Sequence, residues 1–305
     1  MSVLVSVIVP TYNRADKIIK CLESLAGQTY SSLEIIVVDD GSVDDTRQVI
    51  EGFVKERSLE GILFYYRQAN QGAPVARNLG LKKARGSYVV FFDSDDMMFP
   101  DRIRKQVEAM NREKSDCSAC GFVHSSNEEV FIPEVDAEKG YIGSLIYWKL
   151  MGSTQCWMYK KEILEKIGGY DPSYACYQDW DLTFRYLTYA RKIALVKESL
   201  SIFHNDERKD RITSQVQAEK RIPHIQRFHI KVIDWLLQEK QDAKLLNHML
   251  FNYVHQVTLP YYKGGMKAKA KESYSSLAQV VKQKSLSKAF SLRFVFFKHL
   301  IKEMV

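Results

Sequence analysis

The first hundred residues alternate short apolar runs with segments whose apolar side chains recur at helical spacing. Residues 3–9 form a nearly continuous apolar run that ends at Pro10, as expected of a strand buried on both faces. The other predicted elements are strands at 33–38, 62–66 and 88–92 and helices at 18–25, 49–54 and 73–84. Strands separated by helices in this way are typical of βαβ units and a mostly parallel sheet.

The remainder of the chain is mixed and then helical. The strands expected in the middle are 118–123, 129–132, 193–196 and 200–203, and a helix is expected at 178–190. From about 213 onward the pattern is helical, with few glycines or prolines. We therefore expect an α/β domain over 1–210, with a mostly parallel central sheet and flanking helices, followed by an α-helical region over 211–305.

The formal net charge of the 305 residues is +7, and it is unevenly distributed. Residues 263–305 hold ten lysines and arginines against two acids, a net +8, which leaves −1 for the first 262 residues. A near-neutral body with a basic tail argues against a protein that contacts nucleic acid over its whole surface. The sequence also contains no recognisable nucleic-acid recognition motif, so we expect no nucleic-acid partner.

Simple features of the sequence exclude other classes of protein. No run of 18 apolar residues is present, and the N-terminus has neither the basic region nor the cleavage site of a secretory signal. The five cysteines are an odd, sparse set, as expected of reduced thiols in a cytoplasmic protein. The GxGxxG fingerprint, the P-loop, HExxH and GxSxG are all absent.

Polar residues directly follow three of the predicted strands, at 11–14, 39–42 and 93–96. In an open α/β sheet, ligands bind outside the carboxyl ends of the strands. If the three strands are neighbours, these polar groups share one crevice. Within the second cluster, Ser42 and Asp45 also resemble a capping box that would start the helix over 49–54.

The third cluster contains three carboxylates within four residues, Asp93, Asp95 and Asp96. Such carboxylates repel one another, and a divalent cation would relieve that repulsion. Mg²⁺ in particular is usually held by one or two carboxylates together with substrate phosphates. An acidic surface turn is the alternative. A calcium EF-hand loop is disfavoured, because Met97 occupies its fifth position and no glycine follows.

Short motifs follow one another along the first two-thirds of the chain. They are 5–14 (VSVIVPTYNR), 36–42 (IVVDDGS), 70–72 (NQG), 76–78 (ARN), 86–88 (GSY), 92–96 (FDSDD), 167–171 (IGGYD) and 178–182 (QDWDL). In this order and spacing they resemble the bacterial family 2 glycosyltransferases, over about residues 3–204. The resemblance implies the Rossmann-like GT-A type fold and an enzyme that transfers a sugar from a nucleoside-diphosphate donor.

The resemblance implies a nucleotide-sugar site at the strand ends. Thr11, Tyr12 and Arg14 would line the base pocket, with Tyr12 stacked on the base. Asp40 would accept a hydrogen bond from a base N–H, which suits uracil best. Arg77 is similar to the family's basic residue near the nucleotide. The full implied set is Pro10, Thr11, Tyr12, Arg14, Asp40, Arg77, Asp93, Ser94 and Asp95.

The same resemblance implies a metal ion and a catalytic base. Asp93 would contact the ribose, and Asp95 would bind Mn²⁺ or Mg²⁺ with Asp93 and His204 as further ligands, so that the ion neutralises the leaving diphosphate. Asp179 matches the family's proposed base, which would activate the acceptor hydroxyl and lead to inversion at the anomeric carbon. The alternatives are a structural histidine at 204 and, for Asp179, a helix-start acid favoured by the dipole.

The residues around Asp179 would form the acceptor sugar pocket, namely Gln178, Trp180 and Asp96. Gln178 stands where many family members have glutamate. Trp180 is either a platform for a sugar or part of the core. Asp181 and Arg185 lie four residues apart and are expected to form a structural pair.

The basic tail carries an apolar stripe on one helical face, made of Leu286, Phe290, Phe294, Phe297, Ile301 and Met304. A basic helix with such a stripe can lie on an anionic membrane surface. We favour the interpretation that this apolar stripe packs on protein, either on the catalytic domain or on a second copy of the chain in a homodimer.

The sequence therefore predicts an inverting, hexosyltransferase-type enzyme with a glycan or lipid-linked acceptor, acting in bacterial surface polysaccharide assembly. It would be cytoplasmic, or peripheral at the inner face of the membrane. Two alternatives stay open. A haloacid-dehalogenase-type phosphatase also has an apolar strand followed by DxD, but it needs Thr or Val where Met97 stands. A non-catalytic nucleotide-sugar-binding scaffold would not need Asp179.

Overall fold

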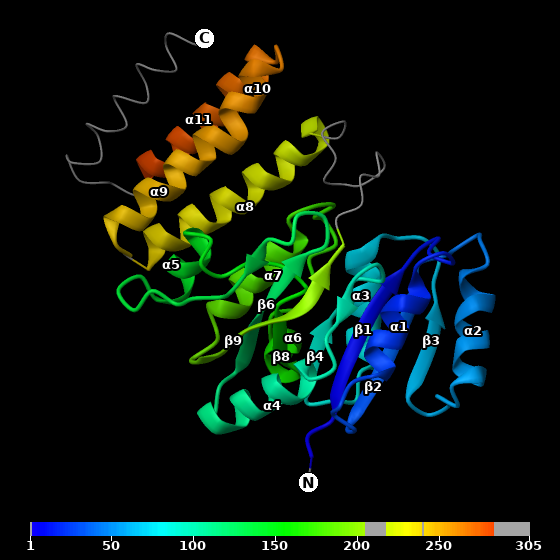
Figure 1. Cartoon of the computed structure of the whole chain (residues 1–305). Helices are drawn as coiled ribbons and strands as arrows, with labels where there is room; N and C mark the ends of the chain where they lie inside the picture. Colours follow the sequence, from blue (N-terminus) through cyan, green and yellow to red (C-terminus); the bar gives the residue numbers. More distant parts are fainter. Residues whose placement is uncertain (1, 205–217, 240, 284–305) are drawn as a thin grey trace. The chain divides into compact units, whose positions relative to one another are not determined.

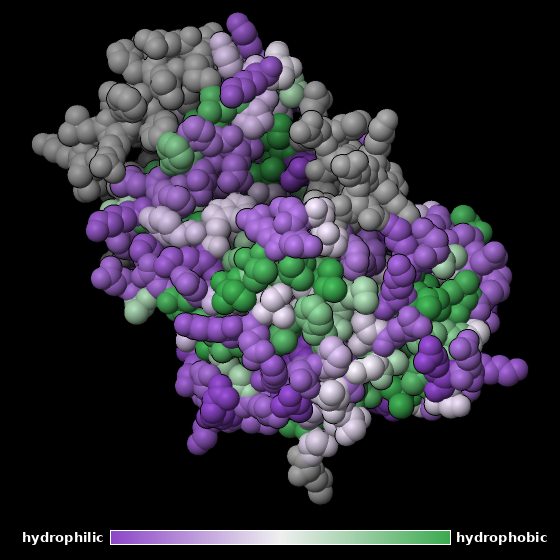
Figure 2. Space-filling view, in the orientation of Figure 1, coloured by the Kyte–Doolittle hydropathy of each residue, from purple (hydrophilic) through white to green (hydrophobic). Residues whose placement is uncertain are grey.

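The chain divides into two compact units, residues 1–207 and 208–305, where the sequence pattern places the division at 210. The computed structural model describes residues 2–204, 218–239 and 241–283. The first unit contains a sheet with its helices, and the second is helical (Figure 1). On the face that Figure 2 shows, hydrophilic side chains cover most of the surface of each unit.

A nine-stranded sheet forms the centre of the first unit. Its strands are β1 Val5–Thr11, β2 Leu33–Asp39, β3 Leu63–Arg67, β4 Tyr88–Phe91, β5 Met97–Met98, β6 Cys117–His124, β7 Val130–Phe131, β8 Trp157–Lys160 and β9 Ile193–Phe203. The order is β3-β2-β1-β4-β8-β6-β9-β5, and β7 pairs with β6. The strands β1 to β4 pair in parallel, as do β6 and β9, whereas β5, β7 and β8 pair antiparallel to their neighbours.

Helices pack on both faces of this sheet. They are α1 Ile18–Ala26, α2 Thr46–Glu56, α3 Ala73–Lys83, α4 Arg102–Glu113, α5 Gly140–Ile146, α6 Lys161–Lys166 and α7 Gln178–Leu187. On one face, Val5, Val7 and Val9 join α1 side chains in a core cluster. On the other face, a Cβ at Gly80 of α3 would lie 2.3 Å from Cγ2 of Ile8, so glycine is required there. The apolar run of β1 is therefore buried on both faces, as predicted.

The first strand extends further than its sequence predicts. β1 continues through Pro10 to Thr11, whereas the apolar run ends at Pro10. Pairing with β4 stops at Ile8, and only β2 continues alongside β1, to Asp39. A missing backbone N–H therefore costs no ladder hydrogen bond on the β4 side, which is why a proline is tolerated in a central strand.

The two short strands predicted at 193–196 and 200–203 are one strand, β9. Its register on β6 shifts by two residues, because Cys120 pairs with Val196 and the next residue, Gly121, pairs with Ser199. This irregularity takes up the polar residues 197–199, which read in the sequence as a break between two strands.

Helix α4 is missing from the sequence-based expectations, because its buried face is partly polar. Arg102 and Gln106 are fully buried there, which interrupts the apolar stripe. The Arg102 guanidinium donates to Gln106, to the Ser201 hydroxyl at 2.7 Å and to the Trp157 carbonyl. Only the packing of α4 on β8 and β9 satisfies these polar groups.

The second unit consists of α8 Ala218–Gln238, α9 Ala243–Tyr253, the π-helical turn η2 Val254–Thr258, α10 Leu259–Lys263 and α11 Lys267–Gln283. Its helices are joined by buried polar contacts. The Tyr253 hydroxyl donates to the Ser273 carbonyl at 2.8 Å, and the Thr258 and Ser273 hydroxyls lie 3.2 Å apart. His229 is buried as well, with Nδ1 2.8 Å from the Ile225 carbonyl.

The structure describes only part of the basic tail. The apolar stripe from Leu286 to Met304, on which the membrane and homodimer expectations rest, lies outside the described residues. Four lysines of the tail are exposed: Lys263, Lys267, Lys269 and Lys271. None of the helices within 2–204, 218–239 and 241–283 has the length and apolar character needed to cross a membrane.

The buried histidine predicts acid sensitivity of the second unit. Burial lowers the pKa of His229 from 6.5 to about 4. The unfolded chain takes up a proton below pH 6.5 that the folded unit resists, so stability is full above pH 6.5 and falls as the pH drops towards 4. At pH 5 we expect a loss of about 2 kcal/mol in the free energy of unfolding.

Urea denaturation at pH 7.5 and pH 5 measures this loss. His229→Leu should remove the part of this loss that His229 causes, and the exposed His255, changed in His255→Gln, serves as the matched control. An equal loss in His229→Leu and wild type would show that His229 is not responsible.

Candidate functional site

The polar segments at three strand ends lie together, as the sequence predicts. β2, β1 and β4 are neighbours and run parallel, so the chain leaves all three at the same edge of the sheet. Pro10, Thr11 and Ser94 are buried at this edge. The Thr11 carbonyl accepts the Asp40 N–H at 2.8 Å, which joins the ends of β1 and β2. The Thr11 hydroxyl is buried without a hydrogen-bond partner among the described residues.

The loops after β1 and β2 are bonded to each other. The Asn13 N–H donates to the Ser42 hydroxyl and the Val43 N–H donates to the Asn13 side chain, both at 2.9 Å. Asn13 has a φ of +51°, a left-handed conformation that asparagine tolerates well. These bonds hold the loop that carries Tyr12 and Arg14, and they leave the Tyr12 ring 45% exposed.

The predicted capping box at the start of α2 is wrong. Ser42 uses its hydroxyl to accept from the first loop, and Asp45 makes no side-chain capping bond. Asp44 accepts the Thr46 N–H at 3.1 Å in its place. The Ser42 hydroxyl therefore joins the loops after β1 and β2 and does not cap α2.

Asp40 already accepts three hydrogen bonds from the protein. Its oxygens accept from the Gln68 amide at 2.7 Å, the Gln71 N–H at 2.9 Å and the Gly72 N–H at 2.7 Å. These bonds tie the end of β2 to the turn that starts α3. A carboxylate has about four lone-pair positions, so Asp40 retains room for about one further donor.

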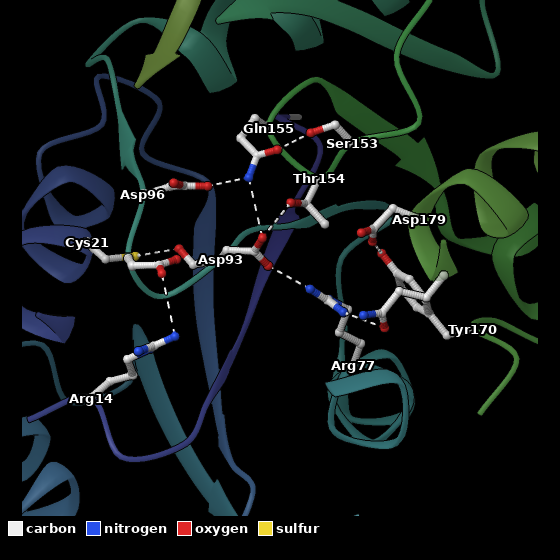
Figure 3. Close-up of polar contacts among 12 residues, drawn as sticks. Arg14, Cys21, Arg77, Asp93, Asp96, Ser153, Thr154, Gln155, Tyr170 and Asp179 are labelled. Carbon is white, nitrogen blue, oxygen red and sulfur yellow. Dashed lines mark hydrogen bonds and ion pairs between the residues drawn. The ribbon is translucent and has the colours of Figure 1, made fainter. Parts of the chain in front are cut away.

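Asp93 is held from two sides (Figure 3). One oxygen accepts from the Arg77 guanidinium at 2.6 Å. The other accepts from the Thr154 hydroxyl at 3.1 Å and the Gln155 amide at 3.4 Å. These partners come from α3 and from the segment before β8, so Asp93 lies where three parts of the domain meet.

The two other acids of the cluster point elsewhere. Asp95 lies 3.6 Å from the Arg14 guanidinium. Asp96 is buried, accepts from the Gln155 amide, and accepts the backbone N–H of His204 at 2.9 Å. Burial raises the pKa of Asp96 well above its ordinary value, and the charges of Asp93 and Asp95 raise it further.

The repulsion that the sequence implies is thus relieved within the protein. Across the part of the chain that the structure describes, no three His, Cys, Asp or Glu side chains form a group that could hold a metal ion. Asp93 and Asp95 keep 31% and 15% of their side-chain surface exposed. A site with one or two carboxylates completed by substrate phosphates fits Mg²⁺ or Mn²⁺ here, whereas a cage of three carboxylates does not.

Asp179 lies in the first turn of α7 and is half-buried. The Tyr170 hydroxyl donates to its Oδ1 at 2.9 Å. Burial raises the pKa of the Asp179 carboxyl, Arg77 partly counteracts this, and the charge of Asp93 raises the pKa again. A carboxylate with a raised pKa accepts a proton more readily near neutral pH, which is what general-base catalysis requires.

Arg77 connects the two acidic positions. Its Nη2 bonds to Asp93 and its Nη1 donates to the Gln178 side-chain oxygen at 3.0 Å, while its guanidinium lies 5.1 Å from the centre of the Tyr170 ring. Burial by itself would lower the pKa of Arg77, but Tyr170, Asp179 and Asp93 outweigh it and raise the pKa. The neutral side-chain oxygen of Gln178 suffices as the acceptor in this contact, so a glutamate is not required at this position.

Three residues that the sequence leaves without a role complete the site, namely Thr154, Gln155 and Tyr170. Tyr170 lies within the IGGYD motif, which was the one available signal. Thr154 and Gln155 belong to no recognisable motif, and only the folded structure brings them into contact with Asp93. The Asp181–Arg185 pair is confirmed at 2.7 Å. Trp180 is half-buried and meets the Trp148 ring edge-on at a centroid distance of 4.6 Å.

Comparisons with known proteins agree on the family. The family model Glycosyl transferase family 2 matches residues 6–168. The putative teichuronic acid biosynthesis glycosyltransferase TuaG of Bacillus subtilis is 41% identical over 119 residues, 39% of this chain and 46% of TuaG. The uncharacterized glycosyltransferase EpsJ of the same organism is 37% identical over 131 residues, 43% of this chain and 37% of EpsJ. The matched segment thus spans less than half of either relative.

Two solved structures share the architecture. Staphylococcus aureus TarS 1–349 in complex with UDP-GlcNAc has a TM-score of 0.65 at 20% identity, over 92% of both chains. The mannosyltransferase PcManGT from Pyrobaculum calidifontis, in complex with GDP-Man and Mn²⁺, has a TM-score of 0.61 at 17% identity, over 98% of this chain and 81% of that one. These likenesses confirm the expected GT-A fold. With the family model covering more than half of its length, the chain belongs to glycosyl transferase family 2.

Proposed function

We propose that this chain is a metal-dependent, inverting glycosyltransferase of the hexosyltransferase type that uses a UDP-sugar. The observation that carries the proposal is the chain of contacts from Asp93 through Arg77 to Gln178 and Tyr170, which ends at Asp179. It links Asp93, an acid of the proposed donor site, to Asp179, a carboxylate whose pKa is raised.

The strand ends support a uracil nucleotide. Thr11 pairs with Asp39, so Tyr12 and Asp40 follow paired residues on adjacent strands. Asp40 has room for about one more donor, and uracil offers one ring N–H where guanine offers a ring N–H and an amino group. TarS was solved with UDP-GlcNAc and PcManGT with GDP-Man, so both donors belong in the test.

Asp95, with Asp93, is the proposed site for Mn²⁺ or Mg²⁺ together with the donor diphosphate. When bound, such an ion supplies a Lewis acid that neutralises the charge of the leaving group. Arg14, 3.6 Å from Asp95, adds a positive charge at the same place. His204 is held here by its backbone bond to Asp96 and remains a proposed further ligand.

Asp179 is the proposed base. It takes the proton of the acceptor hydroxyl while that oxygen forms a bond to the anomeric carbon. The bond between that carbon and the diphosphate breaks on the opposite face, the nucleoside diphosphate leaves, and the configuration inverts. Tyr170 orients the carboxylate. Gln178 and Trp180 border the acceptor, and Asp96 contributes by holding Gln155.

The proposed acceptor is a glycan or a lipid-linked sugar in bacterial surface polysaccharide assembly, which the name of TuaG supports. The corresponding location is the cytoplasm or the inner membrane face, with the basic tail as a membrane contact or a homodimer contact. Family membership disfavours the phosphatase, since the DxD motif is part of the glycosyltransferase match. Binding of UDP without turnover would favour the scaffold.

Two substitutions test the assigned roles. With Mn²⁺ and a panel of UDP-sugars and GDP-mannose, Asp179→Asn should lower turnover at least roughly a hundredfold, because the general base is lost. Asp95→Ala should raise the Mn²⁺ concentration needed for half-maximal turnover. Release of nucleoside diphosphate measures both effects.

Glu51→Gln is the control, since Glu51 is an exposed α2 carboxylate that pairs with Arg47. It should behave like wild type. Wild-type turnover in Asp179→Asn and Asp95→Ala would refute the assigned roles.

The hydrogen bond from Tyr170 predicts a shift in the pH profile. This bond lowers the pKa of Asp179, so its removal in Tyr170→Phe should raise that pKa. Activity requires the ionised base, so the acid limb of kcat/KM should move to higher pH. Tyr186→Phe removes a buried hydroxyl that donates to the Asp116 carbonyl, away from the site, and should leave the profile in place.

A further inference from the structure

Three aromatic side chains gather next to the proposed base, and we call them the aromatic cluster: Trp148, Tyr177 and Trp180. Trp180 directly follows Asp179 in the first turn of α7. Its ring meets Trp148 edge-on at a centroid distance of 4.6 Å and lies roughly parallel to Tyr177 at 6.4 Å. Trp148 comes from the segment after α5, about thirty residues away in the sequence.

The start of α7 separates the aromatic cluster from the acidic side of the site. Tyr177 and Trp180 are three residues apart, which places them on one side of the helix start. Gln178 and Asp179 point to other partners, Arg77 and Tyr170. A molecule lying on the aromatic cluster would therefore border the base without displacing the contacts that hold it.

The segment that carries Trp148 continues to the donor side. A Cβ at Gly152 would lie 2.7 Å from Trp180, so the backbone packs directly on that ring. Two and three residues later, Thr154 and Gln155 hold Asp93. One short segment thus spans from the aromatic cluster to Asp93, on the proposed donor side.

The backbone and the exposure of Trp148 are unusual for a core residue. Trp148 has a φ of +60° and Tyr177 a φ of +63°, a left-handed conformation that is rare for bulky side chains and clusters at functional sites. Although it contacts another tryptophan, Trp148 remains 46% exposed. Because the Trp148 ring is exposed, packing in the core does not account for the left-handed backbone at this residue.

We propose that Trp148 is the stacking surface for the acceptor, and that the acceptor's reacting part is a pyranose sugar. An indole ring offers a flat apolar surface for the C–H face of a sugar and an N–H for a hydroxyl. Asp179, beside this surface, takes the proton of the hydroxyl that the stacked sugar presents. This inference rests on the proposed function and narrows its acceptor to a saccharide.

Binding of simple sugars tests the inference directly. Saturation-transfer NMR with the methyl β-glycosides of glucose, galactose and N-acetylglucosamine, with UDP present, should show contact between wild type and the ring protons of at least one glycoside. Trp148→Gly keeps a left-handed backbone and removes the ring, and it should weaken that binding about tenfold or more. Trp148→Phe should recover part of the affinity.

The control is Tyr189→Ala. Tyr189 is 49% exposed and lies beyond the other end of α7, so its removal should leave glycoside binding unchanged. Hydrolysis of UDP-sugars without acceptor, which should be the same in Tyr189→Ala and wild type, tests the donor side separately. Absence of hydrolysis in wild type with every UDP-sugar of the panel would count against the proposed function, whereas the comparison of glycoside binding between Trp148→Gly and wild type tests Trp148 independently.

Three results would overturn the inference. Wild type could bind none of the glycosides, or Trp148→Gly could bind them as wild type does. Alternatively, Trp148→Gly could change the oligomeric state in gel filtration with unaltered glycoside binding, which would make Trp148 a contact between copies of the chain.

Discussion

The buried guanidinium of Arg77 is the interaction on which the rest of the site depends. Arg77 is 4% exposed, and a cation in that position is stable only with compensating partners. Asp93 at 2.6 Å, the Gln178 oxygen and the Tyr170 ring provide them. In return, Arg77 draws α3, the end of β4 and the start of α7 together. Removing it would leave two partly buried acids, Asp93 and Asp179, without the charge of this cation.

The acids that follow β4 are also stabilised by separate polar or charged partners. Three neighbouring acids are tolerated because each has a different environment: Asp93 faces Arg77, Asp95 faces Arg14, and buried Asp96 accepts from Gln155 and from the His204 N–H. Asp93 and Asp95 remain partly exposed, as the proposed divalent-ion site requires. The fold prepares this arrangement before any substrate binds, which reduces the reorganisation that the reaction requires.

Much of the fold could be predicted, because it depends on local apolar periodicity. Val7 and Ile8 on alternate faces of β1 already require helices on both sides of the sheet. The sequence-based prediction failed where a polar side chain forms its hydrogen bonds with residues far away in the chain. The buried Arg102 interrupts the apolar pattern of α4, and its partners on β8 and β9 are known only from the fold. Ser42 resembles a helix cap in the sequence, but its hydroxyl accepts from Asn13 in another loop.

The sequence alone determined the alternation of strands and helices over the first hundred residues and the acids at the strand ends, since each is a short-range pattern. Its resemblance to the family implied Asp179 as the candidate base. Only the tertiary structure decided where those side chains point and what they touch. The directions of the carboxylates, the raised pKa of Asp179 and the meeting of Trp148 with Trp180 join residues far apart in the chain. Such contacts depend on how helices and strands pack, because packing sets side-chain direction and burial together.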